Sequence, residues 1–440
     1  MAILLRGGTL LPMSGALREI GADILVSGAR IAQIGTDLQL PPDTEVVDCS
    51  GCYLMPGLVQ THVHLVQTMF RGLAEDLGLL DWLRRFIWPL EAAHDEASVR
   101  ACVRLGLGEL LTTGTTTILD MGTTRWGDVV AEELVRSGIR ARFGQAMMDT
   151  GDRVPANLVE TTRDSLDASA GLVKRWTKAG AGRIGYAYAP RFALSCTREL
   201  LEAVGMLAKM SELLVHTHSN ESAEERAAVQ GATGMSPIGY LAQVGIATPR
   251  TVIAHGVHVD DEELATLRDS GSAVTHCPSS NLKLGSGVAD VVRLRQARIT
   301  VGIGADGAAC NNELDGFAEV RLATLLARTL RGQGALTAGD ALAMATREGA
   351  RALHLEEEIG TLEVGRRADI VVIDSERLAG PGGTPAARIV FGGGSRGVRD
   401  VLVDGTFIVR SGAPLLFDPA EVRAKAAEAL PALLKRAEVA

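Results

Sequence analysis

The sequence is poor in aromatic residues and carries no excess of positive charge. Phe, Trp and Tyr together make up 4% of the 440 residues, too few for a row of platforms that stacks single-stranded bases. The formal net charge of −9 disfavours a surface for nucleic acid or for an anionic membrane. We therefore expect partners that include neither a nucleic acid nor a membrane.

Long hydrophobic runs are also missing. No stretch of the chain offers the roughly 20 uncharged apolar residues that a membrane-spanning helix needs. The first residues, MAILLRGGTLLPMSG, contain no basic segment ahead of an apolar core and no evident signal-peptide cleavage site. These absences predict a cytoplasmic enzyme.

Cysteine is scarce as well. Six cysteines in so long a chain do not form a disulfide scaffold of the kind that holds small secreted proteins together. Cys49 and Cys52 have C-x-x-C spacing, but no second pair accompanies them and they lie where an apolar strand ends. We expect both to occupy plain buried or turn positions and not a zinc or redox site.

What the sequence does contain is a strand-rich segment at each end. Short alternating segments with Gly-rich turns occupy residues 1–55, and the same texture returns in residues 359–440. We expect the two ends to pair into one small β-sandwich domain, which the larger domain of residues 56–358 interrupts. A chain of 440 residues is long enough for both domains.

Two features of the C-terminal region carry predictions of their own. The Gly-rich stretch 379–397 is predicted to be a mobile loop. Asp418 and Pro419 have the order of an N-cap and a first-turn proline, and Glu421 follows at the capping-box position. This order predicts a final helix, which Pro431 kinks or ends.

Between the ends, eight short β-rich segments alternate with amphipathic helical segments. Eight strands separated by helices are typical of an α/β fold of the TIM-like (β/α)8 barrel type. The predicted strands are residues 58–64, 115–122, 141–148, 183–190, 213–220, 251–256, 272–278 and 299–306.

Histidines and one aspartate stand near the ends of these predicted strands. In such a barrel the carboxyl ends of all strands meet on one face, where catalytic groups gather. Residues that are far apart in the sequence therefore become neighbours on that face. The residues placed in this way are His62 and His64 in the first strand, His216 and His218 in the fifth, His255 in the sixth, His276 in the seventh and Asp306 in the eighth.

The spacing of these residues predicts a metal site. His62 and His64 project from the same side of a strand because side chains alternate along it, and this spacing suits two ligands of one divalent ion. With His218 and Asp306 from other strands they form a set of three histidines and one carboxylate. Such a set fits zinc or ferrous iron with one position left for water, and we expect zinc.

The remaining polar residues near the strand ends have less definite roles. His216 shares a strand face with His218, but His218 is nearer the strand end, so we expect His216 to pack one layer deeper. His258 and His276 either orient the ligands or are ordinary barrel histidines. Glu221 follows His218 closely and lies within plausible reach of a substrate on the metal.

The order of the motifs resembles the amidohydrolase superfamily. The segments PGLVQTHVH, HTHSNE, AHGVH, HCPSSNLKLGSG and GADGAACNNELD follow one another along nearly the whole chain, each at its expected strand. They are similar to the branch with adenosine-type deaminases, guanine deaminase and s-triazine hydrolases. A non-catalytic scaffold is the alternative, but it would have lost metal ligands, and none is lost here.

The resemblance implies a mononuclear metal enzyme. The predicted fourth strand contains no lysine, so a carbamylated bridge between two metals is not supported. The resemblance gives the ligands of the single divalent metal as His62, His64, His218 and Asp306, and the catalytic groups as Glu221 and His255 with Asp306.

These groups suit hydrolytic deamination of an aromatic amidine. A metal lowers the pKa of bound water to about 7, which gives hydroxide at neutral pH. Asp306 can accept the proton of that water, and His255 can hydrogen-bond the developing tetrahedral centre. Glu221 can protonate a ring nitrogen beside the attacked carbon, and later protonation lets ammonia leave.

The residues that would contact the ring point in two directions. Trp82 and Glu91 resemble the nucleoside-deaminating branch, where the matching glutamate holds ribose hydroxyls. Gln67, Arg191 and Phe192 resemble guanine deaminase, whereas S-adenosylhomocysteine deaminases typically carry a histidine where Arg191 stands. Gln67 and Arg191 follow strand ends on the catalytic face. We expect all five side chains to contact the substrate.

We therefore predict hydrolytic deamination of an aminopurine, either a guanine-like base or a 5′-modified adenosine such as 5′-deoxyadenosine. A guanine-like edge is favoured slightly, because Gln67 and Arg191 should touch the ring itself. Cys310 stands where a melamine-type triazine deaminase also carries cysteine, which leaves s-triazine amino- or chlorohydrolysis open. The expected partners are a small-molecule substrate and further copies of this chain in a homo-oligomer.

Overall fold

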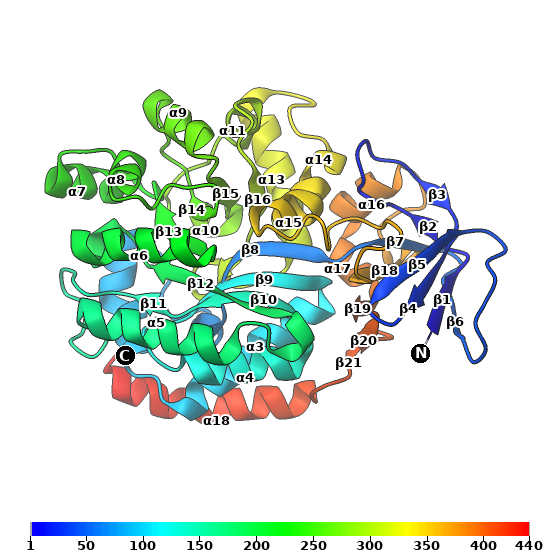
Figure 1. Cartoon of the computed structure of the whole chain (residues 1–440), viewed down its shortest axis with the longest axis horizontal. Helices are drawn as coiled ribbons and strands as arrows, with labels where there is room; N and C mark the ends of the chain where they lie inside the picture. The colour runs from blue at the N-terminus through cyan, green and yellow to red at the C-terminus, as the bar shows by residue number, and fades with distance from the viewer. Residues whose placement is uncertain (1, 440) are drawn as a thin grey trace.

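A closed barrel of parallel strands forms the larger part of the protein (Figure 1). The computed structural model describes residues 2–439. The barrel strands are β8 (Leu58–His64), β9 (Thr115–Met121), β10 (Arg140–Gly144), β11 (Ala146–Met147), β12 (Ile184–Pro190), β13 (Leu214–Ser219), β14 (Thr251–His255), β15 (Ala273–His276), β16 (Val301–Ile303) and β17 (Asp306–Gly307). Strand β10 pairs with both β9 and β12, which closes the sheet. The predicted TIM-like α/β fold is confirmed.

The last predicted strand, residues 299–306, is interrupted and forms β16 and β17. Between these two strands, Ala305 donates its N–H to the side chain of Gln60 at 2.9 Å. Pairing resumes at Asp306, which lies opposite Val63 of β8. The interruption therefore brings Asp306 directly beside the strand that carries the H-x-H histidines.

Helices cover the outside of the barrel (Figure 1). They include α3 (Glu96–Thr112), α4 (Gly127–Ser137), α5 (Thr162–Trp176), α6 (Arg198–Ser211), α7 (Ala223–Thr233), α8 (Pro237–Gln243), α9 (Asp261–Ser270), α11 (Val291–Gln296) and α13 (Gly316–Arg331). Asp95, Thr197 and Asp260 cap α3, α6 and α9 by accepting backbone N–H groups of the first turn. Within residues 2–439, no helix is long and apolar enough to cross a membrane.

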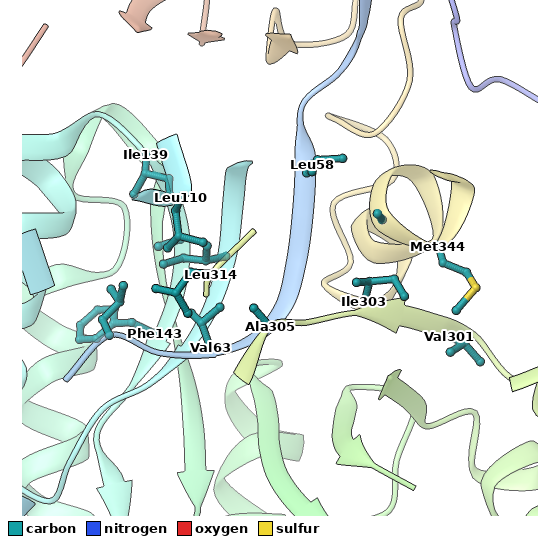
Figure 2. Close-up of a cluster of buried hydrophobic side chains, with 14 of the residues drawn as sticks. Leu58, Val63, Leu110, Ile139, Phe143, Val301, Ile303, Ala305, Leu314 and Met344 are labelled. Atoms are coloured by element: carbon teal, nitrogen blue, oxygen red, sulfur yellow. The ribbon is translucent and has the colours of Figure 1, made fainter. Parts of the chain in front are cut away.

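The barrel and its helices share one hydrophobic core. Figure 2 shows labelled members of it, including Leu58 and Val63 of β8, Leu110 of α3 and Ile303 of β16. Each fully buried aliphatic side chain of this kind contributes roughly 1.5–3 kcal/mol relative to an exposed position. The core therefore gives a rigid frame to the polar face of the barrel.

Strands from both ends of the chain form two further sheets beside the barrel. Their strands are β1 (Ala2–Arg6), β2 (Thr9–Leu10), β3 (Ile20–Gly21), β4 (Asp23–Ser27), β5 (Arg30–Gly35), β6 (Glu45–Asp48), β7 (Cys52–Pro56), β18 (Ile370–Asp374), β19 (Val398–Val403), β20 (Thr406–Arg410) and β21 (Ala413–Pro414). The sheet orders are β5-β4-β1-β6 and β21-β20-β19-β18-β7-β2-β3. The two ends thus pair as expected, while the boundaries 55/56 and 358/359 stay predictions.

Strand β18 joins the small domain to the barrel. Ile370 and Val372 lie in the core between the two small sheets, whereas Val371 and Ile373 lie in the barrel core. This division follows from the alternation of side chains along a strand. Because both faces are buried, the strand has a continuous apolar sequence.

The cysteines occupy buried positions, as expected. All six are free and buried. Cys49 and Cys52 lie in the core of the small domain, and the guanidinium of Arg399 reaches their sulfur atoms at 3.6 and 3.4 Å. Burial raises the pKa of the Cys49 thiol to about 11, so it is protonated at neutral pH.

The prediction of a mobile loop at residues 379–397 is wrong. This stretch contains the helices α16 (Pro385–Gly392) and α17 (Gly394–Gly397). Thr384 caps α16 through its side chain, Pro385 occupies the first turn, and Ile389 is fully buried. The cap and the apolar face outweigh the high glycine content.

The final helix, α18 (Pro419–Ala437), runs through Pro431 instead of ending there. Asp418 caps it, but its carboxylate accepts from the N–H of Ala420 at 2.8 Å, in place of the predicted capping box. Leu433 is fully buried. Figure 1 shows α18 lying along α3, so the end of the chain packs on the barrel.

Candidate active site

Four side chains predicted as metal ligands meet at the carboxyl end of the barrel. His62 and His64 come from β8, His218 from β13 and Asp306 from β17. The Nε2 atoms of His64 and His218 lie 3.1 Å apart. Oδ1 of Asp306 lies 3.2 Å from Nε2 of His62 and 3.5 Å from Nε2 of His64. The structure thus brings together the whole predicted set.

This arrangement fits a divalent metal. Two nitrogen ligands of a tetrahedral zinc, each about 2.0–2.1 Å from the ion, lie about 3.3 Å apart, close to the distances found here. Nε2 of His62 is buried and has no hydrogen-bond partner among residues 2–439. Nitrogen lone pairs that face one another in a buried site repel unless a cation lies between them. His62, His64 and His218 could therefore hold a metal ion together.

Backbone carbonyl groups set the orientation of two of these rings. Nδ1 of His64 donates to the carbonyl oxygen of Met121 at 2.7 Å. Nδ1 of His218 donates to the carbonyl oxygen of Arg191 at 2.7 Å. Because Nδ1 carries the proton in each ring, the lone pair of Nε2 is directed into the site.

His216 orients the third ring. Its Nε2 lies 2.8 Å from Nδ1 of His62, and both side chains are fully buried. His216 lies beneath the predicted ligands and is not one of them. This agrees with the expectation, because His216 stands two residues before His218 on the same face of the strand. It acts on the site through His62.

Burial favours the neutral form of His64 and His218. It is the largest cause that lowers the pKa of His64 to about 3, and the neighbouring His62 adds to the effect. The same two causes hold the pKa of His218 well below its usual range. Neutral imidazole is the form that binds a metal, so protons do not compete for these rings near neutral pH.

Glu221 and His255 lie beside the ligand set. Nε2 of His255 is 3.4 Å from Oε2 of Glu221 and 3.9 Å from Oδ2 of Asp306. Nδ1 of His255 donates to Oδ1 of Asn281 at 2.9 Å, which fixes the ring. The three groups predicted to be catalytic therefore face one another across a few ångströms.

The backbone at the site is strained at two of these positions. His255 has a φ of 77° and Asp306 a φ of 62°. Non-glycine residues in this left-handed region cost roughly 1–3 kcal/mol each and persist only where the surrounding structure imposes them. Such strain is frequent at functional sites, where it points side chains in directions that a regular strand does not allow.

Glu225, which sequence reasoning missed, supports Glu221. Oε2 of Glu225 accepts the backbone N–H of Glu221 at 2.9 Å. Burial first, and then the charges of Asp306 and Glu225, hold the pKa of Glu221 well above its usual range. The signal in the sequence was the capping-box order of Ser222 and Glu225 at the start of α7, where Ser222 is the N-cap.

A pocket opens beside the ligand set and contains most of the predicted substrate residues. Gln67, Trp82, Arg191 and Phe192 all line it. Glu91 does not line it and is buried behind this wall. The remaining lining residues are His64, Leu79, Leu83, His218, Glu221, His255 and Asp306.

Three of the predicted substrate residues form one hydrogen-bonded cluster. Nη1 and Nη2 of Arg191 donate to the two carboxylate oxygens of Glu91 at 2.6 and 3.2 Å. Nε2 of Gln67 donates to Oε1 of Glu91 at 2.8 Å. The side chains of Arg191 and Glu91 are 4% and 1% exposed, which makes this a buried ion pair.

Three residues had no definite predicted role, and none of them lines the pocket. They are His258, His276 and Cys310. His276 is buried, and both of its ring nitrogens lack a partner among the described residues. Nε2 of His258 donates to the carbonyl oxygen of Ser286 at 2.8 Å. Sγ of Cys310 is buried and donates to the carbonyl oxygen of Gly307 at 3.1 Å, so it does not line the pocket.

Comparison with known proteins decides the family. The sequence pattern of the amidohydrolase family matches residues 53–408. The chain belongs to the amidohydrolase family. A 5′-deoxyadenosine deaminase of Methanothermobacter thermautotrophicus is 37% identical over 93% of this chain and 94% of its own length. A 5-methylthioadenosine/S-adenosylhomocysteine deaminase of Halobacterium salinarum is 37% identical over 90% of each chain.

Solved structures of this family have the same architecture. A zinc-bound adenosine deaminase of Xanthomonas campestris aligns with a TM-score of 0.92 at 30% identity, over 98% of each chain. The zinc complex of the atrazine chlorohydrolase TrzN of Arthrobacter aurescens gives 0.91 at 28% identity, over 98% and 100%. The guanine deaminase of E. coli gives 0.83 at 27% identity, over 93% and 99%.

Proposed function

We propose that this enzyme removes the amino group from the adenine ring of 5′-modified adenosines by hydrolysis, with 5′-deoxyadenosine as the first candidate substrate. The observation that carries the proposal is the complete set of three histidines and one aspartate beside Glu221 and His255. The chemistry of that set suits hydrolysis of an aromatic amidine. Relatives at 37% identity over most of the chain are named for this substrate class.

The slight preference for a guanine-like edge is withdrawn. It rested on Gln67 and Arg191, which line the pocket and could contact either kind of purine, so the comparisons decide between them. The E. coli guanine deaminase is 27% identical, compared with 37% for the 5′-deoxyadenosine deaminase. The balance of similarity favours the nucleoside.

A single divalent ion is proposed for the site, with zinc as the first candidate. His62, His64, His218 and Asp306 would hold it. The related adenosine deaminase and atrazine chlorohydrolase structures contain zinc. When bound, the ion would supply a water nucleophile at neutral pH.

Protein groups then move the protons. Asp306 is placed to accept a proton from the attacking water, and Ser280 steadies it by donating to its Oδ2 at 2.6 Å. Burial raises the pKa of Glu221 well above its usual range, which favours the protonated form that can donate to a ring nitrogen. His255 donates through Nδ1 to Asn281, so its neutral Nε2 is an acceptor that would hydrogen-bond the O–H of the attacking water.

The pocket wall supplies the contacts to the ring. Trp82 and Phe192 are buried aromatic side chains that would pack against a purine face. Gln67 and Arg191 would hydrogen-bond its edge. Glu91, which was expected to hold ribose hydroxyls, is buried and accepts hydrogen bonds from Arg191 and Gln67.

The triazine alternative loses its support from the sequence. It rested on Cys310, which is buried against the backbone of Gly307 and does not reach the pocket. The similarity to the atrazine chlorohydrolase is one of architecture at 28% identity. The homo-oligomer stays a prediction.

The direct test is conversion of 5′-deoxyadenosine by the metal-loaded protein. We expect stoichiometric release of ammonia together with 5′-deoxyinosine, followed by mass spectrometry and an ammonia assay. Chelator treatment should abolish turnover and added zinc should restore it. A metal-loaded preparation that releases no ammonia from 5′-deoxyadenosine, 5-methylthioadenosine or S-adenosylhomocysteine would overturn the proposal.

A further inference from the structure

Glu319 is a buried carboxylate outside the pocket, in the first turn of α13. It is 1% exposed. Its Oε1 accepts from Oγ of Ser279 at 2.5 Å and from Nδ2 of Asn311 at 3.0 Å, and its Oε2 accepts the backbone N–H of Ser279 at 3.1 Å. A buried carboxylate without such donors is costly, so the three hydrogen bonds hold the two donor segments against α13.

The first donor segment is the start of the short helix α10 (Pro278–Lys283). A helix of 6 residues is not stable by itself, and Cys277 at its N-cap position makes no capping hydrogen bond through its side chain. Glu319 takes the place of the missing cap, because it binds both the N–H and the hydroxyl group of Ser279. A side chain of α13 therefore holds the start of α10.

The two residues that follow Ser279 contact the catalytic groups. Ser280 donates its hydroxyl group to Oδ2 of Asp306 at 2.6 Å. Asn281 accepts from Nδ1 of His255 through its Oδ1 at 2.9 Å. A shift of α10 would therefore move the partners of Asp306 and His255 together.

The second donor segment reaches Asp306 from its backbone. Asn311 ends the short helix α12 (Ala308–Asn311), and its Nδ2 donates to the carbonyl oxygen of Ala305 at 2.8 Å as well as to Glu319. Ala305 directly precedes Asp306, whose φ of 62° persists only where the surrounding structure imposes it. Glu319 therefore supports Asp306 on its backbone side here, and on its carboxylate side through α10.

We propose that Glu319 is a positioning residue, which fixes Asp306 and His255 in the geometry of the reaction without touching the substrate. It acts through its hydrogen bonds to Ser279 and Asn311. The proposal rests on the proposed function for the reaction that it serves. Because Glu319 does not line the pocket, it should affect the rate of the chemical step and not substrate binding.

Steady-state kinetics separate these two effects. Glu319→Met keeps a side chain of similar length but removes both acceptor oxygens. With 5′-deoxyadenosine and zinc-saturated protein, we expect kcat to fall by about fivefold or more while KM stays within about threefold of wild type. A smaller fall in kcat, or a larger change in KM, would overturn the proposal.

Ser279→Ala tests the same contact from the other side, with a smaller change of volume. It removes the hydroxyl group that donates to Oε1 of Glu319 and keeps the backbone N–H. We expect kcat to fall by about threefold or more, again with little change in KM. This variant serves if Glu319→Met does not fold, and a smaller fall in kcat would overturn the proposal.

A double-mutant cycle tests the route of the effect. Glu319→Met, Ser280→Ala and the double variant are compared by kcat. If Glu319 acts through α10, the cost of Glu319→Met in kcat should be about threefold smaller, or less still, in the Ser280→Ala background. Losses that simply multiply would mean that the two residues act independently, which contradicts the proposal.

Glu133 provides a matched control away from the pocket. It too is a buried glutamate whose carboxylate accepts several hydrogen bonds, here from Arg100 and Arg104. Glu133→Met should lower the melting temperature but leave kcat within about threefold of wild type. An equal fall in kcat would show that loss of any buried carboxylate slows the enzyme, and the assignment to Glu319 would fall.

A readout without substrate separates this proposal from the proposed function. Asp306 is a proposed ligand, so loosening it should weaken zinc binding, which competition with a chromophoric chelator measures. Glu319→Met should raise the Kd for zinc by about fivefold or more, whereas Glu133→Met should leave it within about twofold. A smaller rise in Glu319→Met would overturn the proposal even if 5′-deoxyadenosine is the substrate. Wild-type protein that binds zinc but releases no ammonia would overturn only the proposed function.

Discussion

Glu221 is buried beside the acidic residues Asp306 and Glu225, and both effects raise its pKa. A carboxyl group with a raised pKa suits a general acid that donates a proton to the substrate. Replacing Glu221 by glutamine keeps the shape but removes the proton donor. We expect kcat to fall by about 10²-fold or more while the metal content is unchanged. The measurement is steady-state kinetics together with metal analysis of the same preparation.

The matched variant for this prediction is His62→Ala, which should lose metal as well as turnover. If Glu221→Gln retains a kcat close to that of the wild type, Glu221 only binds substrate or supports the fold. A loss of metal in Glu221→Gln would instead place it among the ligands.

Asp120 offers a prediction on pH and stability. It is fully buried on β9, and burial raises its pKa from 3.8 to about 7, against the opposing hydrogen bond from the N–H of Leu65. An acid with a raised folded-state pKa contributes stability that is complete below its unfolded pKa and is lost as the pH rises through the folded pKa. The window is therefore about pH 4 to 7.

Asp120→Asn removes this titration. The free energy of unfolding of the variant, relative to wild type, should rise between pH 4 and pH 8 by up to about 4 kcal/mol, the equivalent of about three pKa units. Urea unfolding at both pH values measures it, with the exposed Asp167→Asn as the control. An unchanged difference between the two pH values would mean that Asp120 is ionised in the folded protein.

At the scale of residues, the sequence predicted the ligand set but not its supports. The H-x-H spacing and the strand ends predicted that His62, His64, His218 and Asp306 lie together, as they do in the structure, because barrel topology alone brings them together. The pairing of Glu91 with Arg191 depends on rotamers and on the depth of each side chain, and no spacing rule encodes these.

Among the elements, the segment between β16 and β17 packs closely against β8. A Cβ added at Gly304 would lie 2.6 Å from the carbonyl oxygen of His62 and 2.9 Å from its backbone nitrogen. Gly304→Ala must therefore displace the backbone of His62. We expect a loss of about 1–3 kcal/mol in stability and a lower metal occupancy.

Unfolding experiments and metal analysis measure both effects of Gly304→Ala. The control is Gly21→Ala in the small domain, where an added Cβ meets nothing within 4 Å. If Gly304→Ala binds metal with wild-type affinity, the position of His62 is set elsewhere, and the close approach of the strands carries no functional weight.

The elements that the sequence predicted wrongly share one cause. In residues 379–397 the glycines suggested a loop, but Thr384 caps a helix there and buried apolar residues hold it. For the final helix the sequence predicted that Pro431 kinks or ends it; the helix does not end there, and it packs against α3. The order of Thr384 and Pro385 is a local helix-start signal, whereas the buried contacts of both helices cannot be predicted from a single sequence.

At the scale of the whole molecule, we expect an enzyme with one metal ion per chain. Purified protein should hold about one zinc or iron per chain, and His218→Ala should lower both metal occupancy and turnover. Elemental analysis with a parallel activity assay measures this. Two ions per chain, or full activity in a metal-free preparation, would contradict the mononuclear mechanism.

The fold as a whole could be predicted from the sequence because the same strand and polar-residue pattern recurs along the chain. Eight strand segments and polar residues at their carboxyl ends indicate one architecture together, although each segment alone is ambiguous. The substrate was not readable in this way. It depends on the few side chains of the pocket wall, and in the sequence Gln67 and Arg191 favoured a guanine-like edge.

The most direct measurement is therefore the ratio of kcat/KM for 5′-deoxyadenosine to that for guanine, taken with the same zinc-loaded preparation and read by ammonia release. We expect a ratio well above 100, because relatives that are 37% identical over most of this chain are named for 5′-modified adenosines. A ratio below one would contradict it and restore the guanine-like reading of Gln67 and Arg191.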